Sequence, residues 1–279
     1  MKCFKAQTEL MLKRKSFIYT LTGMILLSVA AFAANCLFFY GDYIINIRSA
    51  KYLTITSDLQ LFSIIPTIFS LIFPLIPILP FADSYFEERE KMTVDFCLTR
   101  CSCKEYYFSK LAAVFISGAA VIGIPLIINY LLNFIAFPLD SVITSQGFAI
   151  PNCQIYFSEA LDTIIFKDLF CKNMYIYNLI FILIDSLFAG LSAVIIYQIS
   201  FFYTQSRTIL IFIYFAAYHL GTLVLSSFSG NSVSIGNYIL SSHFLSNQTV
   251  FGLLIVLIIL LLSAFAPTAF ALKKLNDLN

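Results

Sequence analysis

The chain has 279 residues, of which 60% are hydrophobic and only 11% are charged. This composition lies outside the range of soluble globular domains, in which about a quarter of the residues are charged. The formal net charge of +2 is too small to indicate a nucleic-acid partner. The sequence therefore predicts an integral membrane protein whose immediate surroundings are the lipid bilayer.

Six stretches are long and apolar enough to cross a bilayer, which takes about 20 residues in a helix. No stretch alternates between apolar and polar residues as a membrane-spanning strand does. We therefore expect the all-α class, with one polytopic transmembrane domain over residues 1–279. The spans are predicted near 17–39, 61–81, 111–137, 176–200, 209–228 and 250–272.

Before the first span, residues 1–15 place Phe4, Met11 and Leu12 among several lysines. This pattern suits a helix that lies in the cytoplasmic interface of the membrane. A positively charged flank without helical structure is the equally weighted alternative.

The second predicted span is interrupted by prolines, each of which removes a backbone hydrogen-bond donor. We expect this span to be kinked or unwound near its cytoplasmic end, where it runs into the sequence EERE. The prolines are Pro66, Pro74, Pro77 and Pro80.

Residues 82–110 form a charged stretch between two apolar spans. Within it, Val94, Cys97, Leu98 and Cys101 have the spacing of one helical face, which predicts a short amphipathic helix. Ser102 and Glu105 have the spacing of a capping box, which predicts that a new helix begins there. A solvated loop is the alternative to the short helix.

Lysine and arginine fall mostly on one side of the predicted spans. Thirteen of them lie in the N-terminal stretch, in residues 82–110, at Arg207 and at Lys273–Lys274, whereas four lie in the other loops. The positive-inside rule then places both termini and residues 82–110 in the cytoplasm. We expect a multi-pass protein of the cell (cytoplasmic) membrane, with outer loops near 40–60, 138–175 and 229–249.

The stretch EREKMTVDFCLTRCSCKEYYFSK resembles the signature of the type-2 ABC transporter permeases, the transmembrane subunits of ABC exporters. That signature has a Glu-Arg/Lys-Glu run, a threonine, an acidic residue, leucines and a lysine after the second of six spans. It differs here in Met92, where glycine is usual, in Cys97, where leucine is usual, and in a missing turn proline. The matching residues are Glu88, Arg89, Glu90, Lys91, Thr93, Asp95, Leu98, Thr99 and Lys110.

The resemblance implies that residues 82–110 couple the spans to a separate ABC ATP-binding subunit. It implies a second permease chain, in a homodimer or a heterodimer, and ATP with Mg²⁺ on the partner ATPase. Leu98 is expected to be the main anchor on that partner, and Lys110 is expected to matter much less. The implied coupling residues are Glu88, Glu90, Thr93, Val94, Cys97, Leu98 and Arg100.

No G-x-x-x-x-G-K-[ST] phosphate loop is present, so we expect a transporter subunit that is no enzyme and has no cofactor of its own. Cys97, Cys101 and Cys103 lack a partner cluster, which favours structural thiols over a metal site. Cys153 and Cys171 share the long outer loop, where a disulfide and two free thiols are both open.

Asp185 and His219 are predicted near the middle of the fourth and fifth spans, where ionisable groups are costly and usually face a bundle interior or a cavity. They are candidates for the translocation pathway, or they hold helices together, as would a contact of Asp185 with Tyr214. An ion-coupled secondary transporter that uses Asp185 is therefore the alternative function. An intramembrane protease is a weaker one, since the chain has no H-E-x-x-H motif.

Overall fold

The computed structural model describes residues 2–43, 47–57, 64–99, 101–140, 164–203, 206–229, 235–241 and 248–276. These residues contain helices and no strand, which confirms the predicted all-α class. The helices are α1 (Lys2–Lys13), α2 (Lys15–Phe38), the 3₁₀ turn η1 (Ala50–Tyr52), α3 (Ile64–Ile72), α4 (Ser84–Glu90), α5 (Thr93–Leu98), α6 (Cys103–Ala136), α8 (Lys167–Lys172), α9 (Met174–Ile199), α10 (Arg207–Ser229), α11 (Ile235–Ile239), α12 (Val250–Phe265) and α13 (Thr268–Asn276).

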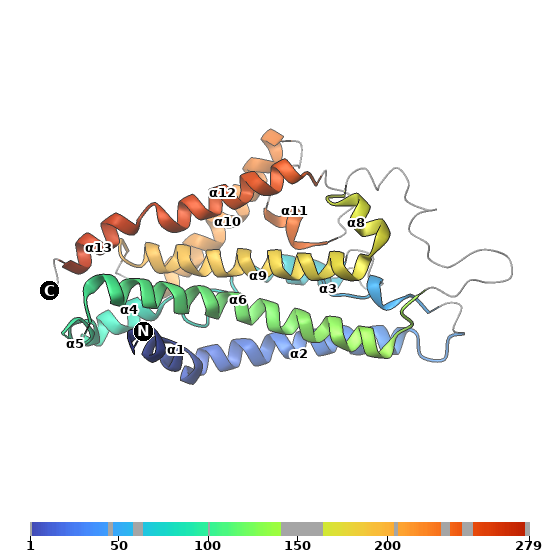
Figure 1. The fold of residues 1–279 in the computed structure, drawn as a ribbon, viewed down its shortest axis with the longest axis horizontal. Coiled ribbons are helices and arrows are strands. Elements are labelled where there is room, and N and C mark those ends of the chain that lie inside the picture. The colour runs from blue at the N-terminus through green and yellow to red at the C-terminus, as the bar shows by residue number, and fades with distance from the viewer. Residues whose placement is uncertain are drawn as a thin grey trace.

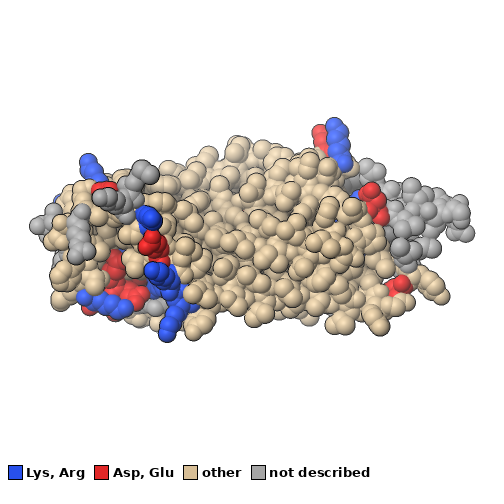
Figure 2. Space-filling view, turned by 60° about the horizontal axis from the view of Figure 1, so that its bottom comes forward, with Lys and Arg blue, Asp and Glu red and all other residues tan. Residues whose placement is uncertain are grey.

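The long helices run along one axis and form an elongated bundle with both chain termini at one end (Figure 1). We call this end, with α1, α4, α5 and α13, the termini end, and the opposite end the far end. On the face that Figure 2 shows, charged side chains gather at the two ends, and the broad band between them shows almost none. Among the described residues, five helical stretches are long and apolar enough to cross a membrane: Lys15–Phe38, Cys103–Ala136, Met174–Ile199, Thr208–Ser227 and Val250–Asn276.

These five stretches match the first, third, fourth, fifth and sixth predicted spans, and they indicate a multi-pass membrane protein. The second predicted span differs. Its helix α3 has 9 residues, which rise only about 14 Å, and residues 73–83 continue it as a series of turns. Pro74, Pro77 and Pro80 lie in these turns, so the predicted interruption is confirmed and extends over about half of the segment.

The core of the bundle is the contact between α6 and α9, the most extensive one between the described helices, and α2 packs on α6 beside it. Small residues allow the two helices to approach closely. A Cβ atom added to Gly118 would lie 2.9 Å from the Ala189 carbonyl oxygen and 2.9 Å from the Ala193 Cβ. A Cβ on Gly123 would lie 2.5 Å from the Ser186 Oγ. Glycine at position 118, where the neighbour is backbone, is therefore a packing requirement.

The N-terminal residues form helix α1, as one of the two sequence-based alternatives predicted. This helix packs against α6 at the termini end. Cys3 and Met11 are buried, whereas Phe4, Leu10 and Leu12 are exposed. The helix thus has one face on the protein and three exposed apolar side chains among its charged ones, which suits a helix in a membrane interface.

Candidate functional site

The charged stretch of the sequence lies at the termini end of the bundle, where two short helices, α4 and α5, precede the long helix α6 (Figure 1). The short predicted helix is confirmed as α5, Thr93–Leu98. The predicted cap is also present, because the Ser102 Oγ accepts a hydrogen bond from the Glu105 amide at 3.3 Å. The stretch is therefore a chain of three helices, and the solvated-loop alternative is wrong.

Met92 joins α4 to α5 in a left-handed backbone conformation, with φ of 51°. Its side chain is 75% exposed. A non-glycine residue pays a steric cost in this conformation, of about 1–2 kcal/mol, because its Cβ approaches the following carbonyl oxygen. The position is therefore one that glycine suits better.

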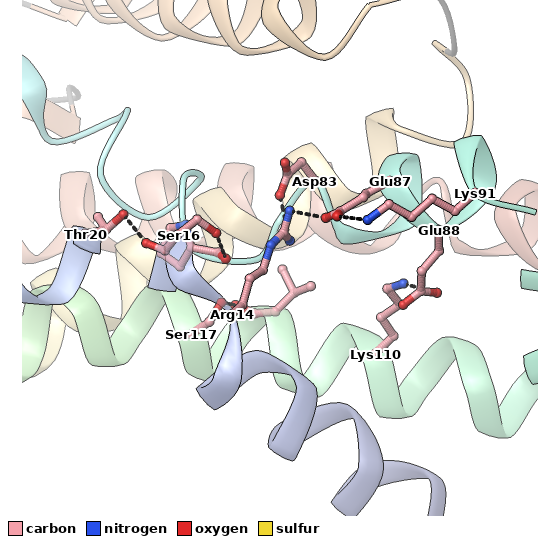
Figure 3. Close-up of polar contacts among 11 residues, drawn as sticks. Arg14, Ser16, Thr20, Asp83, Glu87, Glu88, Lys91, Lys110 and Ser117 are labelled. Atoms are coloured by element: carbon pink, nitrogen blue, oxygen red, sulfur yellow. Dashed lines mark hydrogen bonds and ion pairs between the residues drawn. The ribbon is translucent and has the colours of Figure 1, made fainter. Parts of the chain in front are cut away.

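Glu88 of α4 is bound to α6 through two polar partners. Its Oε2 lies 2.5 Å from the Lys110 Nζ and accepts a hydrogen bond from the Tyr106 hydroxyl at 2.5 Å. The Lys110 Nζ also donates to the Tyr106 oxygen at 3.1 Å. Lys110 is fully buried and Glu88 is only 18% exposed. Figure 3 shows the pair bridging the two helices.

A second group of charges ties the junction of α1 and α2 to α4 (Figure 3). The Arg14 guanidinium lies 2.9 Å from the Asp83 Oδ1 and 2.7 Å from the Glu87 Oε2. The Lys91 Nζ lies 2.6 Å from the Glu87 Oε1 on the exposed side. Together with the Glu88 pair, these contacts fix α4 between the N-terminal helices and α6.

Between α1 and α4 the surface is hollowed into an open pocket with a volume of about 290 Å³. The pocket carries charges of both signs and two apolar side chains. Its lining residues are Leu10, Lys13, Arg14, Phe81, Ser84, Glu87, Glu88 and Lys91.

The apolar face of α5 points into the chain and not away from it. Val94 is 3% exposed and Leu98 6%, and both belong to the main hydrophobic core. Cys97 is partly buried against the same core. We expected Leu98 to be exposed to a partner protein. In this conformation it is not, because its side chain is buried in the chain's own hydrophobic core. The exposed apolar side chains here are Met92 and Phe96, the latter 71% exposed.

The remaining predicted coupling residues are divided. The Thr93 Oγ1 donates to the Glu88 carbonyl oxygen at 3.1 Å, which ties α5 to α4. Glu90 is exposed at the end of α4. Arg100 lies outside the described residues. Glu88 and Lys110 face each other inside the protein, so the expectation that Lys110 matters little is at odds with its buried pairing.

Asp185 lies within α9, fully buried, and neither carboxylate oxygen has a hydrogen-bond partner among the described residues. His219 of α10 is partly exposed, with its Nε2 3.3 Å from the Leu71 carbonyl oxygen near the end of α3. No ion pair between Asp185 and His219 occurs in the described part of the chain. The Tyr218 hydroxyl, beside His219, is the group that interacts electrostatically with Asp185.

Sequence reasoning missed a buried segment at the far end of the bundle. Residues 49–57, predicted as part of an outer loop, are all buried except Lys51. Polar groups of three long helices and of Ser241 form hydrogen bonds with its backbone. The asparagines within the apolar spans were the sequence signal that a polar segment is buried against them. The hydrogen bonds are Asn35 Nδ2 to Leu53 O (3.1 Å), Ile55 N to Asn129 Oδ1 (3.0 Å), Asn178 Nδ2 to Lys51 O (2.9 Å) and Ser241 N to Thr56 O (2.9 Å).

The cysteines form no cluster of metal ligands in the described ranges. The Cys103 Sγ lies 3.8 Å from the Leu275 carbonyl oxygen, and Cys97 and Cys101 pack against the core. Burial, together with a hydrogen bond to Cys101, raises the pKa of the Cys3 thiol. Cys153 lies outside the described residues, so a disulfide with Cys171 and two free thiols both stay open.

Comparisons with known protein families, with curated proteins and with solved structures find no match for this chain.

Proposed function

We propose that the chain is the permease subunit of an ATP-binding-cassette exporter. The observation that supports this best is the connection of α4, Met92 and α5 at the termini end. The type-2 permease pattern has glycine where Met92 stands, and Met92 has the left-handed φ of 51° that glycine suits. The residue at position 92 thus departs from the family pattern, but its backbone has the conformation that the glycine of the pattern would adopt.

The docking surface for the ATP-binding subunit is the outside of the α4–α5 connection. Met92 and Phe96 supply its exposed apolar side chains, with Glu90 at its edge. An exposed aromatic side chain next to charges has the character of an interface anchor, whereas Leu98 supports the helix from behind. The partner carries ATP and Mg²⁺, and a second permease chain completes the transporter.

Motion of the ATPase reaches the membrane through the Glu88–Lys110 pair. The short helix α5 is tied to α4 by Thr93, and α4 is tied to α6 by the buried ion pair. Helix α6 has 34 residues and forms the central contact of the bundle with α9. A displacement of α4 and α5 therefore moves α6 with them, because the buried Glu88–Lys110 pair resists separation.

In this proposal the termini end faces the cytoplasm of the cell membrane. The excess of lysine and arginine in the segments at that end supports the orientation. The second of the six passes is made by α3 and the turns of residues 73–83, whose broken backbone lies inside the protein. Such irregular backbone is tolerated at membrane depth where the protein encloses it.

The proposal is tested by purifying the full chain in mild detergent after membrane cross-linking and identifying bound proteins by mass spectrometry. We expect a partner with a nucleotide phosphate loop that hydrolyses ATP in the purified complex. Phe96→Ala should weaken the association at least tenfold, whereas Phe108→Ala, also exposed at this end on α6, should not. A chain that moves substrate on an ion gradient with no ATPase present would contradict the proposal.

That contrary outcome would favour the second candidate, an ion-coupled secondary transporter. Asp185 supports this second candidate, because it is fully buried in a candidate span and has no hydrogen-bond partner among the described residues. Transporters of this kind bind their coupling ion near the middle of the membrane, next to broken helices such as the one that ends at Ile72.

A further inference from the structure

Asp185 is buried among apolar side chains that offer no positive charge to balance an ionised carboxylate. Its side chain has no exposed surface, and the residues one turn away on the same face of α9, Phe181, Ile182, Phe188 and Ala189, are buried and apolar. Both of its oxygens lack a hydrogen-bond partner in the described ranges. An ionised carboxylate in such a place costs several kcal/mol, so the group needs either a cation or a proton.

The described helices packed on α9 place no lysine or arginine beside Asp185. Residues 111–129 of α6 and the whole of α12 contain no titratable or charged side chain. The charged groups of η1 and α8, and Tyr238 of α11, lie at the far end, beside the first turns of α9. From α10, Tyr214, Tyr218 and His219 lie at a similar depth.

Of these three, Tyr218 interacts with Asp185, and its buried hydroxyl has no hydrogen-bond partner in the part of the chain that the structure describes. Tyr214 interacts with Ser192 of α9 through its hydroxyl. His219 is directed to the Leu71 carbonyl oxygen, and its ring contacts Phe215 and Tyr218. The ligand that fits a closed carboxyl group without a cation is therefore a proton, which needs no additional space.

Among the contacts of α9 with the candidate spans α6, α10 and α12, the one with α10 is the least extensive. Helix α10 is the least buried of the five candidate spans, and it packs on α9 much less extensively than α6 does. Separation of the two helices would admit water to Asp185 while leaving the α6–α9 core intact. Water stabilises a carboxylate strongly, so opening favours loss of the proton.

We propose that Asp185 is an intramembrane proton-binding site, which holds a proton while α9 and α10 are packed together and releases it when they part. On opening, the O–H bond of the carboxylic acid breaks, the proton passes to an entering water molecule, and the bonding electrons stay on the carboxylate. On closing, the reverse step takes up one proton. Binding of a proton goes beyond the proposed exporter function and does not require it.

The first experiment measures whether the proton is there. Infrared difference spectra of the full chain in phosphatidylcholine vesicles at pH 7 compare the wild type with Asp185→Asn. We expect loss of a C=O stretching band of a protonated carboxylic acid, and no loss in Asp140→Asn, whose carboxylate is 91% exposed. Asp185→Glu, which keeps the acid, should shift the band. Spectra in which Asp185→Asn removes no such band overturn the proposal.

The second experiment measures whether opening releases the proton, and it needs no ATPase. In a cysteine-free chain, Ser192→Cys and Tyr214→Cys are joined by a bis-methanethiosulfonate reagent, whose spacer takes the place of the tyrosine ring and whose two disulfides lock α9 to α10. After transfer to D₂O, we expect the carboxylic band to shift to its deuterated frequency at least tenfold more slowly in the locked chain, and reduction should restore the rate. An equal rate in both forms would show that the proton leaves by another route, and the release step would be wrong.

Discussion

The Lys110 Nζ lies 2.5 Å from the Glu88 Oε2, so a fully buried ammonium group on α6 is neutralised by the carboxylate of the short helix α4. The Tyr106 hydroxyl donates to the same oxygen, which leaves the pair well satisfied. Ion pairs of this kind are hard to break, because removal of one member leaves the other as an uncompensated buried charge. The pair therefore decides how firmly α4 and α6 move together.

The first prediction concerns this pair. Lys110→Met should lower the free energy of unfolding by about 3–5 kcal/mol, since the Glu88 carboxylate is left without its cation. The measurement is an SDS titration of the detergent-solubilised chain followed by circular dichroism. The matched control is Lys91→Met, because Lys91 is 64% exposed in its pair with Glu87, and its loss should cost about 1 kcal/mol or less.

Adding Glu88→Gln to Lys110→Met should recover much of the lost stability, because the double variant no longer buries a single charge. If the double variant were as unstable as the sum of the two single ones, the two side chains would not interact in the way described.

The second prediction separates the two apolar residues of α5. Leu98→Ala should lower the free energy of unfolding by about 2–5 kcal/mol, because it opens a cavity in the core. Phe96→Ala should change stability by only about 0.5 kcal/mol, since its side chain is 71% exposed. Equal stability losses for the two variants, measured by the same titration, would contradict the orientation of α5.

The third prediction follows from the backbone of Met92. Met92→Gly should raise the free energy of unfolding or leave it unchanged, within about 1 kcal/mol, because glycine adopts a positive φ without steric cost. Met92→Ala is the control, since it removes the same side chain and keeps the Cβ. A Met92→Gly chain clearly less stable than Met92→Ala would argue against the left-handed conformation.

The fourth prediction tests the close approach of α6 and α9. Gly118→Ala should be destabilising, because the added Cβ would lie 2.9 Å from the backbone oxygen of Ala189, which cannot move without shifting α9. Gly23→Ala on α2 meets nothing within 4 Å and should raise helix stability by about 0.5–1 kcal/mol. Opposite signs in the unfolding titration are expected, and equal signs would refute the packing described.

The fifth prediction concerns orientation in the membrane. Single cysteines at Lys104 and Lys172, each in a cysteine-free chain, lie at opposite ends of the bundle. A membrane-impermeant maleimide applied to intact cells should label position 172 and leave position 104 unlabelled until the cells are opened. Labelling of position 104 in intact cells would contradict the cytoplasmic placement of the termini end, which rests on the distribution of lysine and arginine.

The sequence by itself determined the helical class, the five helical stretches that are long and apolar enough to cross a membrane, the interruption at the prolines and the cap at Ser102. These features depend on local physical chemistry: the hydropathy of about 20 consecutive residues, the missing donor of a proline, and a serine hydroxyl within reach of an amide three residues later. The periodicity of α5 was also readable, since Val94 and Leu98 lie one turn apart.

Only the tertiary structure decided what the apolar face of α5 touches, which acid pairs with Lys110, and where residues 49–57 lie. Periodicity shows that a helix has an apolar face, but it does not show whether that face is buried in this chain's own core or against a partner protein. The partners of Glu88 and Asn129 likewise lie 22 and 74 positions away in the sequence, at Lys110 of α6 and at Ile55 of the segment 49–57. Such pairings arise from tertiary packing, and so does the close approach of α6 to α9 at Gly118 and Gly123, which no local pattern encodes.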